Sequence, residues 1–177
     1  AATDNSNGPA GSKSGRTYVV FGTTSTASIN LSTIAAGVGG FVINGQSSND
    51  YSGWQATTAG DVNGDGYADV LVSSRVASPA IGGTNAGKTY VVFGKSTTTN
   101  IDLSAVAAGT GGFVVNGQAA SDGSGATLSA LGDVNGDGLA DFVVGAQLAD
   151  QTGKVDAGKS YVVFGKTGTT AVELSTV

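Results

Sequence analysis

Short apolar runs bounded by glycine recur along the chain. The clearest of them is Tyr18–Phe21, which reads Tyr-Val-Val-Phe and lies between Gly15 and Gly22. Four consecutive residues of the β-branched and aromatic type favour a strand over a helix. Because both faces of such a strand are apolar, we expect other parts of the molecule to cover it on both sides.

The run belongs to a repeat that returns about every 72 residues. Residues 15–22 return at 87–94 and again at 158–165, so the two offsets are 87 − 15 = 72 and 158 − 87 = 71. Residues 41–46, which read Phe-Val-Ile-Asn-Gly-Gln, return 72 positions later at 113–118. The chain is therefore built from copies of one structural unit.

Each unit predicts four short strands joined by glycine-rich turns. In the middle unit we expect these strands within Gly53–Gly60, within Asp69–Val72, within Tyr90–Phe93 and within Phe113–Val115. A short helical turn is predicted at 101–106, with echoes at 29–34 and 172–177. Four strands in a unit of this length are typical of a β-propeller blade, so the fold class predicted is all-β, with four-stranded antiparallel blades.

The repeat divides the chain into about two and a half blades. Residues 1–50 are predicted to form a partial blade with strands three and four, 51–121 a complete blade, and 122–177 a partial blade with strands one to three. Closed propellers have roughly four to eight blades. We therefore expect either a segment of a larger propeller, packed against neighbouring repeats, or a protomer whose open edges associate with other copies into an oligomer or filament.

Composition excludes several kinds of chemistry. The chain has no Cys and no His, which excludes a disulfide framework, a thiol nucleophile, a Ser-His-Asp triad and imidazole metal ligands. Lys plus Arg is 8 against 13 for Asp plus Glu, a balance that does not suit nucleic-acid binding. No apolar run approaches the roughly 20 residues that span a bilayer, so no membrane span is expected.

The strongest chemical signal is the pattern Asp-x-Asn-x-Asp-Gly-x-x-Asp, which occurs twice at an offset of 72. Side chains at positions 1, 3 and 5 of a tight loop converge, position 7 offers a carbonyl and position 9 a further carboxylate. Oxygen ligands of these types are those that Ca²⁺ prefers. The sequence thus predicts two calcium sites, with metal ligands Asp61, Asn63, Asp65, Tyr67 (carbonyl) and Asp69 in the first, and Asp133, Asn135, Asp137, Leu139 (carbonyl) and Asp141 in the second.

Two other structures could account for these loops. An EF-hand requires a Glu at position 12 between two helices, but position 12 is Val72 and Val144 and lies in a predicted strand. An Asx-rich turn without metal is possible because Asp, Asn and Gly also form ordinary turns. Two copies of a five-position pattern at one offset favour calcium over that alternative.

The loops, followed by an apolar strand and then Gly-x-x-Tyr-Val-Val-Phe-Gly, resemble FG-GAP repeats, the blades of integrin-α-like β-propellers. This variant is similar to repeats in large bacterial surface and secreted proteins, so the resemblance implies an extracellular or cell-surface location and a role in cell adhesion. In the family the loop binds Ca²⁺ between the first two strands of a blade. The sequence departs from the family pattern at Ser52-Gly53 and Ser124-Gly125, where the family has Phe-Gly.

The function expected is that of a calcium-binding structural or adhesive propeller segment without enzyme activity. Acids already bound to calcium make poor general acids, and every close acid pair lies inside one of the two loops. A lectin-like module that binds a glycan is the first alternative, with Tyr51 and Trp54 as stacking candidates or else as packing residues. A non-catalytic propeller appended to a secreted enzyme is the second, and a protein ligand is also open.

Overall fold

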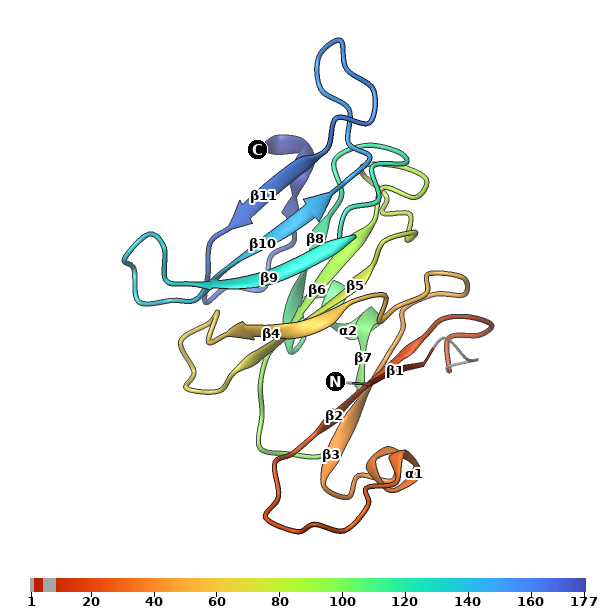
Figure 1. Ribbon diagram of the computed structural model, residues 1–177, viewed down its shortest axis with the longest axis vertical. Coiled ribbons are helices and arrows are strands. Elements are labelled where there is room, and N and C mark those ends of the chain that lie inside the picture. Colours follow the sequence, from red (N-terminus) through yellow and green to blue (C-terminus); the bar gives the residue numbers. More distant parts are fainter. Residues whose placement is uncertain (1, 5–8) are drawn as a thin grey trace.

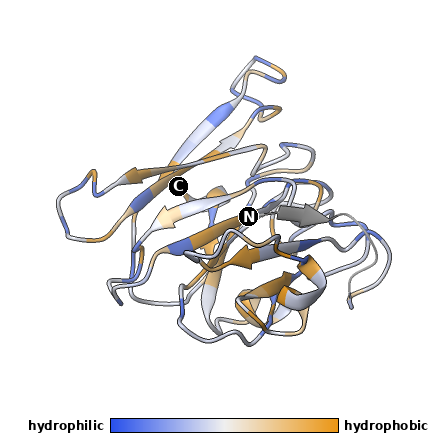
Figure 2. Cartoon of the chain, turned by 60° about the horizontal axis from the view of Figure 1, so that its bottom comes forward, coloured by the Kyte–Doolittle hydropathy of each residue, from blue (hydrophilic) through white to orange (hydrophobic). Residues whose placement is uncertain are grey.

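Three β-sheets lie one above another along the long axis of the molecule (Figure 1). The computed structural model describes residues 2–4 and 9–177. Each sheet is built mainly from one sequence unit, which confirms the prediction of blade-like repeats in an all-β fold. In Figure 2 the apolar residues are concentrated on the stacked strands.

The first unit forms one outer sheet together with β7 (Ile101–Asp102) of the middle unit, and the strand order is β1-β2-β3-β7. Its elements are β1 (Ala2–Asp4), β2 (Arg16–Val20), α1 (Leu31–Ala35) and β3 (Gly40–Asn44). β2 and β3 are the antiparallel pair predicted as strands three and four of a blade. β1 pairs with the edge of β2 that faces away from β3. In the middle unit the second strand of the blade occupies this place. No feature of the sequence predicted β1.

The middle unit forms a five-stranded sheet together with β12 (Val172–Glu173) of the third unit, and the strand order is β12-β8-β6-β5-β4. Its elements are β4 (Ala56–Gly60), β5 (Asp69–Ser74), β6 (Lys88–Val92), β7 (Ile101–Asp102), α2 (Leu103–Ala107) and β8 (Gly112–Asn116). β4, β5, β6 and β8 are consecutive antiparallel neighbours, as expected of a four-stranded blade.

The third unit forms the other outer sheet, with the order β11-β10-β9. Its strands are β9 (Thr127–Gly132), β10 (Asp141–Ala146) and β11 (Lys159–Val163). The chain then returns to the middle unit as β12 (Val172–Glu173) and a 3₁₀ turn, Leu174–Thr176.

Two short parallel strands join each unit to the preceding one. β7 pairs with β3 of the first sheet, and β12 pairs with β8 of the middle sheet. Side chains reinforce both contacts: Asn44 Nδ2 donates to Asp102 Oδ1 at 2.8 Å, and Asn116 Nδ2 donates to Glu173 at 2.6 Å. Two of the three segments predicted only as helical turns, 101–106 and 172–177, therefore begin as short strands of the preceding blade.

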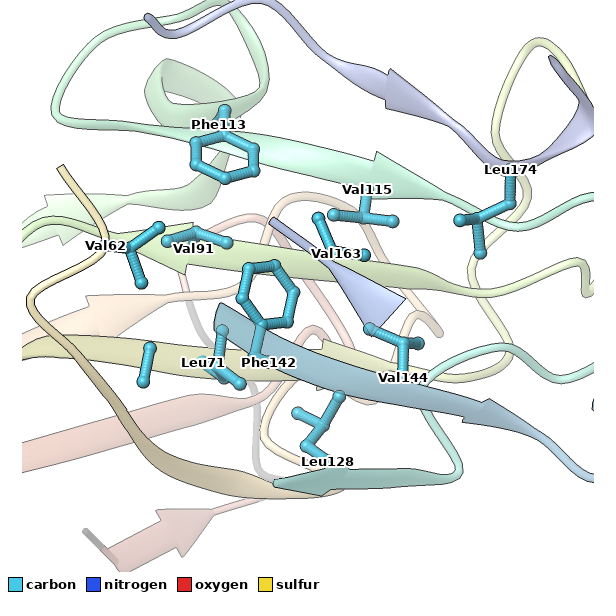
Figure 3. Close-up of a cluster of buried hydrophobic side chains, with 11 residues drawn as sticks. Val62, Leu71, Val91, Phe113, Val115, Leu128, Phe142, Val144, Val163 and Leu174 are labelled. Carbon is cyan, nitrogen blue, oxygen red and sulfur yellow. The ribbon is translucent and has the colours of Figure 1, made fainter. Parts of the chain in front are cut away.

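Two apolar layers fill the spaces between the sheets. Between the first and middle sheets, Phe41 and Ile43 pack with Tyr90, Val92 and other apolar residues. Between the middle and third sheets, most of the buried side chains drawn in Figure 3 come from β5, β6 and β8 on one side and from β9, β10 and β11 on the other. Ala59 of β4, Val62 of the first loop and Leu174 of the last turn complete this layer. β6 contributes to both layers, which confirms that its apolar run is covered on both faces.

The Asn-Gly pair that ends the fourth strand has a steric cause. A Cβ on Gly117 would lie 2.0 Å from the carbonyl oxygen of Ala86, and a Cβ on Gly45 would lie 1.9 Å from that of Ser14. Only glycine allows these backbones to approach so closely.

Candidate metal centres

The two aspartate-rich loops occupy equivalent places in the fold. The first connects β4 to β5 and the second connects β9 to β10. Each begins where the first strand of a blade ends. Asp69 and Asp141, the last positions of the pattern, are the first residues of β5 and β10.

Backbone N–H groups converge on the first carboxylate of each loop. Asp61 Oδ1 accepts from Gly64 N–H at 2.7 Å and from Asp65 N–H at 3.1 Å, and its Oδ2 accepts from Gly66 N–H at 2.9 Å. Gly64 and Gly66 have φ values of 78° and 88°, which allow the chain to curl around that carboxylate.

The second loop repeats this arrangement. Asp133 accepts from the N–H groups of Gly136, Asp137 and Gly138 at 2.7, 3.1 and 2.8 Å. The N–H of Gly138, followed by the other backbone donors, lowers the pKa of Asp133 below its ordinary value. Two loops that share no residues thus fold to the same local geometry, as the repeated sequence requires.

Asn63 and Asp65 interact with one another on the exposed side of the first loop. Asp65 N–H donates to Asn63 Oδ1 at 2.9 Å, and Asn63 Nδ2 donates to Asp65 Oδ2 at 2.9 Å. Asn135 and Asp137 make the same two contacts in the second loop. Among the described residues, the carbonyls of Tyr67 and Leu139 accept no backbone hydrogen bond. These two carbonyl oxygens therefore keep their capacity for another donor or a cation.

Asp69 and Asp141 hold the loops to the strands beneath them, and both are fully buried. Asp69 Oδ2 accepts from Val62 N–H at 2.8 Å, and Asp69 Oδ1 accepts from Gly94 N–H at 2.7 Å. Burial raises the pKa of Asp69, an effect that the two N–H donors oppose and the charges of Asp65 and Asp61 increase. The carboxylates of Asp61 and Asp65 therefore lie near enough to Asp69 to disfavour its charged form.

Asp141 is held in the same way by Val134 N–H at 2.9 Å and Gly165 N–H at 2.8 Å. Gly94 and Gly165 follow the Tyr-Val-Val-Phe strands, so each loop is tied to the end of the third strand of its own blade. Sequence reasoning missed these two glycines. The signal was the Phe-Gly pair that recurs in every unit.

Contacts of the first loop with the third unit were not predicted from the sequence either. Ala140 N–H donates to the carbonyl of Asp61 at 2.8 Å, and Lys166 N–H donates to the carbonyl of Val62 at 2.9 Å. The first loop is therefore packed against the third unit. Val62 is fully buried, whereas its equivalent Val134 is 54% exposed.

The carboxylates of the loops face backbone donors rather than a common centre. Among residues 2–4 and 9–177, no three Asp or Glu side chains are arranged so that they could hold a metal ion by themselves. The predicted ligands are gathered into two loops, but their carboxylate oxygens are engaged with N–H groups of the same loops and of Gly94 and Gly165.

The chemistry of the donor set nevertheless fits a hard cation. Each loop offers three carboxylates, one amide oxygen and one carbonyl. A carboxylate oxygen has about two lone-pair sites. Among the described residues, each oxygen of Asp65 and of Asp69 accepts a single hydrogen bond, so each retains a site that a cation could occupy.

The other residues singled out in the sequence lie near the start of each blade. Asp122 accepts from Ala119 N–H at 3.2 Å, a contact typical of a side-chain-stabilised turn. Burial raises the pKa of Asp122 and that of Asp50. Trp54 is 51% exposed, and the guanidinium of Arg75 lies 4.1 Å from its ring centroid.

The antiparallel strands of each blade lie in sequence order, and the sheets are stacked face to face. In the middle and third units an aspartate-rich loop joins strands one and two. These features define the class of β-propeller-type blade repeats. The sequence profile of the FG-GAP repeat family matches residues 52–92 and 124–163. The chain therefore carries FG-GAP repeats, which confirms the resemblance. The two matched segments contain β4–β6 and β9–β11.

No curated protein matches the chain. None of the helices within the described ranges is long and apolar enough to cross a membrane.

Proposed function

We propose that this chain is a calcium-binding structural segment of an extracellular β-propeller. The observation that carries the proposal is the pair of oxygen-rich loops, each with the same hydrogen bonds 72 residues apart and each anchored on a buried aspartate. A turn without metal does not require three acids. Three carboxylates held close together also repel one another, which would destabilise an empty loop. A cation accounts for their repetition.

Calcium would be held by the oxygens of Asp61, Asn63, Asp65, Tyr67 and Asp69, and by those of Asp133, Asn135, Asp137, Leu139 and Asp141. When bound, the ion supplies positive charge that offsets the three carboxylates of a loop. The residues of the chain orient the site: the N–H groups of Gly64 and Gly66 hold Asp61, and those of Val62 and Gly94 hold Asp69.

The role we propose for the ion is stabilisation. Because each loop joins strands one and two and is tied to the end of strand three, a bound cation would link three strands of one blade. A ligand that binds only the folded state increases stability by mass action. Extracellular modules function with weak sites, with dissociation constants of roughly 10⁻⁴–10⁻³ M.

Calorimetric titration with CaCl₂ and thermal unfolding at rising calcium concentration test the proposal. We expect two binding events and a higher melting temperature with calcium than with a chelator. Asp65→Asn and Asp137→Asn should each remove one event. Asp150→Asn, which alters an exposed acid outside the loops, is the matched control. If about 10⁻² M calcium, well above the weak sites of this kind, produced neither heat nor a melting shift, the metal assignment would be wrong.

The proposal includes association. The third sheet ends in β11, whose outer edge has no partner strand among the described residues. An open edge and the apolar faces beside it favour contact with further blades, either neighbouring repeats of a longer chain or other copies of this one. We propose a structural or adhesive role of this kind, outside the cell and without catalysis.

A carbohydrate-binding module is the second candidate, and the exposure of Trp54 favours it. One face of the indole is occupied by Arg75, and a sugar would require the other. A glycan array compared with the Trp54→Ala variant distinguishes the two functions: a glycan bound by the parent chain and lost in the variant would replace the structural proposal with the lectin-like one.

A further inference from the structure

Equivalent residues bury the interfaces between the three units. In the middle and third units, the last valine of the third strand and the leucine after the short parallel strand face the preceding unit. All four are at most 6% exposed: Val92, Leu103, Val163 and Leu174. They belong to the two apolar layers between the sheets.

The first unit presents the same positions to solvent. Val20 is 39% exposed and Leu31 is 38% exposed, although their equivalents are buried. Ile29 is 49% exposed, whereas its equivalents Ile101 and Val172 lie in β7 and β12 and are paired with a preceding blade. We call Val20, Ile29 and Leu31 the leading surface.

The third unit leaves the opposite half of the same interface open. In the middle unit, Ala59, Val62 and Val91 are fully buried against the third unit, and Phe93 packs beside them. Their equivalents are 40–54% exposed. These four residues, Leu131, Val134, Val162 and Phe164, are called the trailing surface.

The backbone at the end of β11 also has an N–H group without a backbone acceptor among the described residues. Phe21 N–H and Phe93 N–H donate to the carbonyls of Gly39 and Gly111 at 2.9 and 3.0 Å. The N–H of Phe164 finds no such backbone acceptor in the described part of the chain. The trailing surface therefore combines apolar side chains with an unpaired strand edge.

The leading surface carries no charge that would oppose docking. Residues 20–42 contain no Asp, Glu, Lys or Arg, whereas the equivalent stretch 92–114 contains Lys95 and Asp102. Burying an unpaired charge is costly, and cores of protein interfaces are depleted in charged residues. This stretch can be covered without that cost.

We propose that copies of this chain associate head to tail, with the trailing surface of one copy packed on the leading surface of the next. The two surfaces are the two halves of an interface that the chain already forms twice within itself. They lie in the first and third units, at opposite ends of the long axis (Figure 1). A heterologous contact of this kind leaves one surface of each kind free, so further copies add until the rotation between them closes a ring, or without limit as a filament if it does not close. The proposal rests on the association proposed above and specifies its geometry.

A two-fold arrangement is the main competitor. Two copies could pair their β11 edges antiparallel, which would bury the trailing surface of both copies and leave both leading surfaces exposed. The two arrangements therefore differ in whether the leading surface is needed.

Sedimentation velocity of single-residue variants tests the proposal. Leu31→Asp places a charge on the leading surface and Phe164→Asp places one on the trailing surface. Ile81→Asp alters an equally exposed apolar residue of the β5–β6 connection and is the control. We expect the parent chain and Ile81→Asp to associate as concentration rises, and each of the other two variants to associate at least about tenfold more weakly.

Mixing the two blocked variants gives the decisive result. Phe164→Asp retains an intact leading surface and Leu31→Asp retains an intact trailing surface, so an equimolar mixture should form dimers and nothing larger. Ile29→Asp and Val162→Asp serve as a second pair, with circular dichroism spectra to show that each variant is folded.

Three outcomes would overturn the head-to-tail geometry. If Leu31→Asp associated as well as the parent chain while Phe164→Asp did not, the contact would be two-fold, and the association part of the proposed function would stand. Absence of dimers in the mixture would also reject the geometry. A parent chain that stayed monomeric would reject association itself, while the calcium titration would still decide the metal sites independently.

Discussion

At the residue scale, the nine-position pattern contains two kinds of aspartate. The acids at positions 1 and 5 are exposed or half-exposed, and water can replace their partners. Asp69 and Asp141 are fully buried and accept N–H groups from two separate parts of the chain. Buried N–H groups that lose their acceptor are costly, so the last aspartate is structural whether or not a metal is bound.

Asp141→Ala should lower the free energy of unfolding by at least about 2 kcal/mol with a chelator present, because Val134 N–H and Gly165 N–H lose their acceptor. Asp137→Ala should change it by less than about 1 kcal/mol under the same conditions, because its carboxylate is exposed. Urea unfolding with EDTA measures both. Equal destabilisation by the two variants would contradict the structural role of Asp141.

Sequence reasoning identified the residues of the loops but not their partners. The spacing of acids, asparagines and glycines predicts which side chains gather in a loop, because that depends on neighbours within nine positions. The bond from Gly94 to Asp69 spans 25 residues and exists only because β6 pairs with β5 in one register. The engagement of the carboxylates with backbone donors was likewise visible only in the folded chain.

At the element scale, the short strands β7 and β12 link the units. Each continues into a helical turn whose leucine enters an apolar layer, Leu103 in one case and Leu174 in the other. The sequence predicted the helical turns from a local pattern. It could not predict parallel pairing with β3 and β8, because two residues carry too little pattern to specify a partner strand.

Leu174→Ala should destabilise the fold by about 2–4 kcal/mol, because the side chain is 1% exposed and its loss leaves a cavity between two sheets. Leu31→Ala is the matched control, since it is the same residue type at the equivalent position but 38% exposed, and its effect should stay below about 1 kcal/mol. Denaturant unfolding at low protein concentration, where copies are separate, measures both. A similar loss in the two variants would argue against the coupling role of β12.

At the scale of the whole molecule, the middle sheet has a neighbouring sheet on both faces, whereas each outer sheet has a neighbouring sheet on only one. Leu71, Val72, Val91 and Val92 are fully buried, whereas Val162 is 53% exposed. Local opening is least frequent where buried apolar contacts are most numerous. The three blades should therefore differ in stability although their sequences are similar.

Hydrogen exchange followed by mass spectrometry should show the slowest amides in β5 and β6 and faster exchange in β11. The differences in exchange rate between the units should become smaller at high protein concentration if copies stack, because the outer faces of the molecule are then covered. Exchange in β11 as slow as in β6 in a dilute sample would contradict this order.

The sequence by itself determined the repeat, the strand content of each unit and the two loops with their candidate ligands. The strands and loops depend on apolar runs, turn residues and spacing over fewer than about ten positions, and the repeat is visible because these local patterns recur about every 72 residues. The tertiary structure decided which strand of one unit covers the next, which equivalent residues are buried, and where the loop carboxylates find their partners. Val62 and Val134 have the same residue type and the same place in the repeat, but only Val62 has a following blade to bury it. Burial is a property of neighbours in space, and the chain acquires those neighbours only when its units stack.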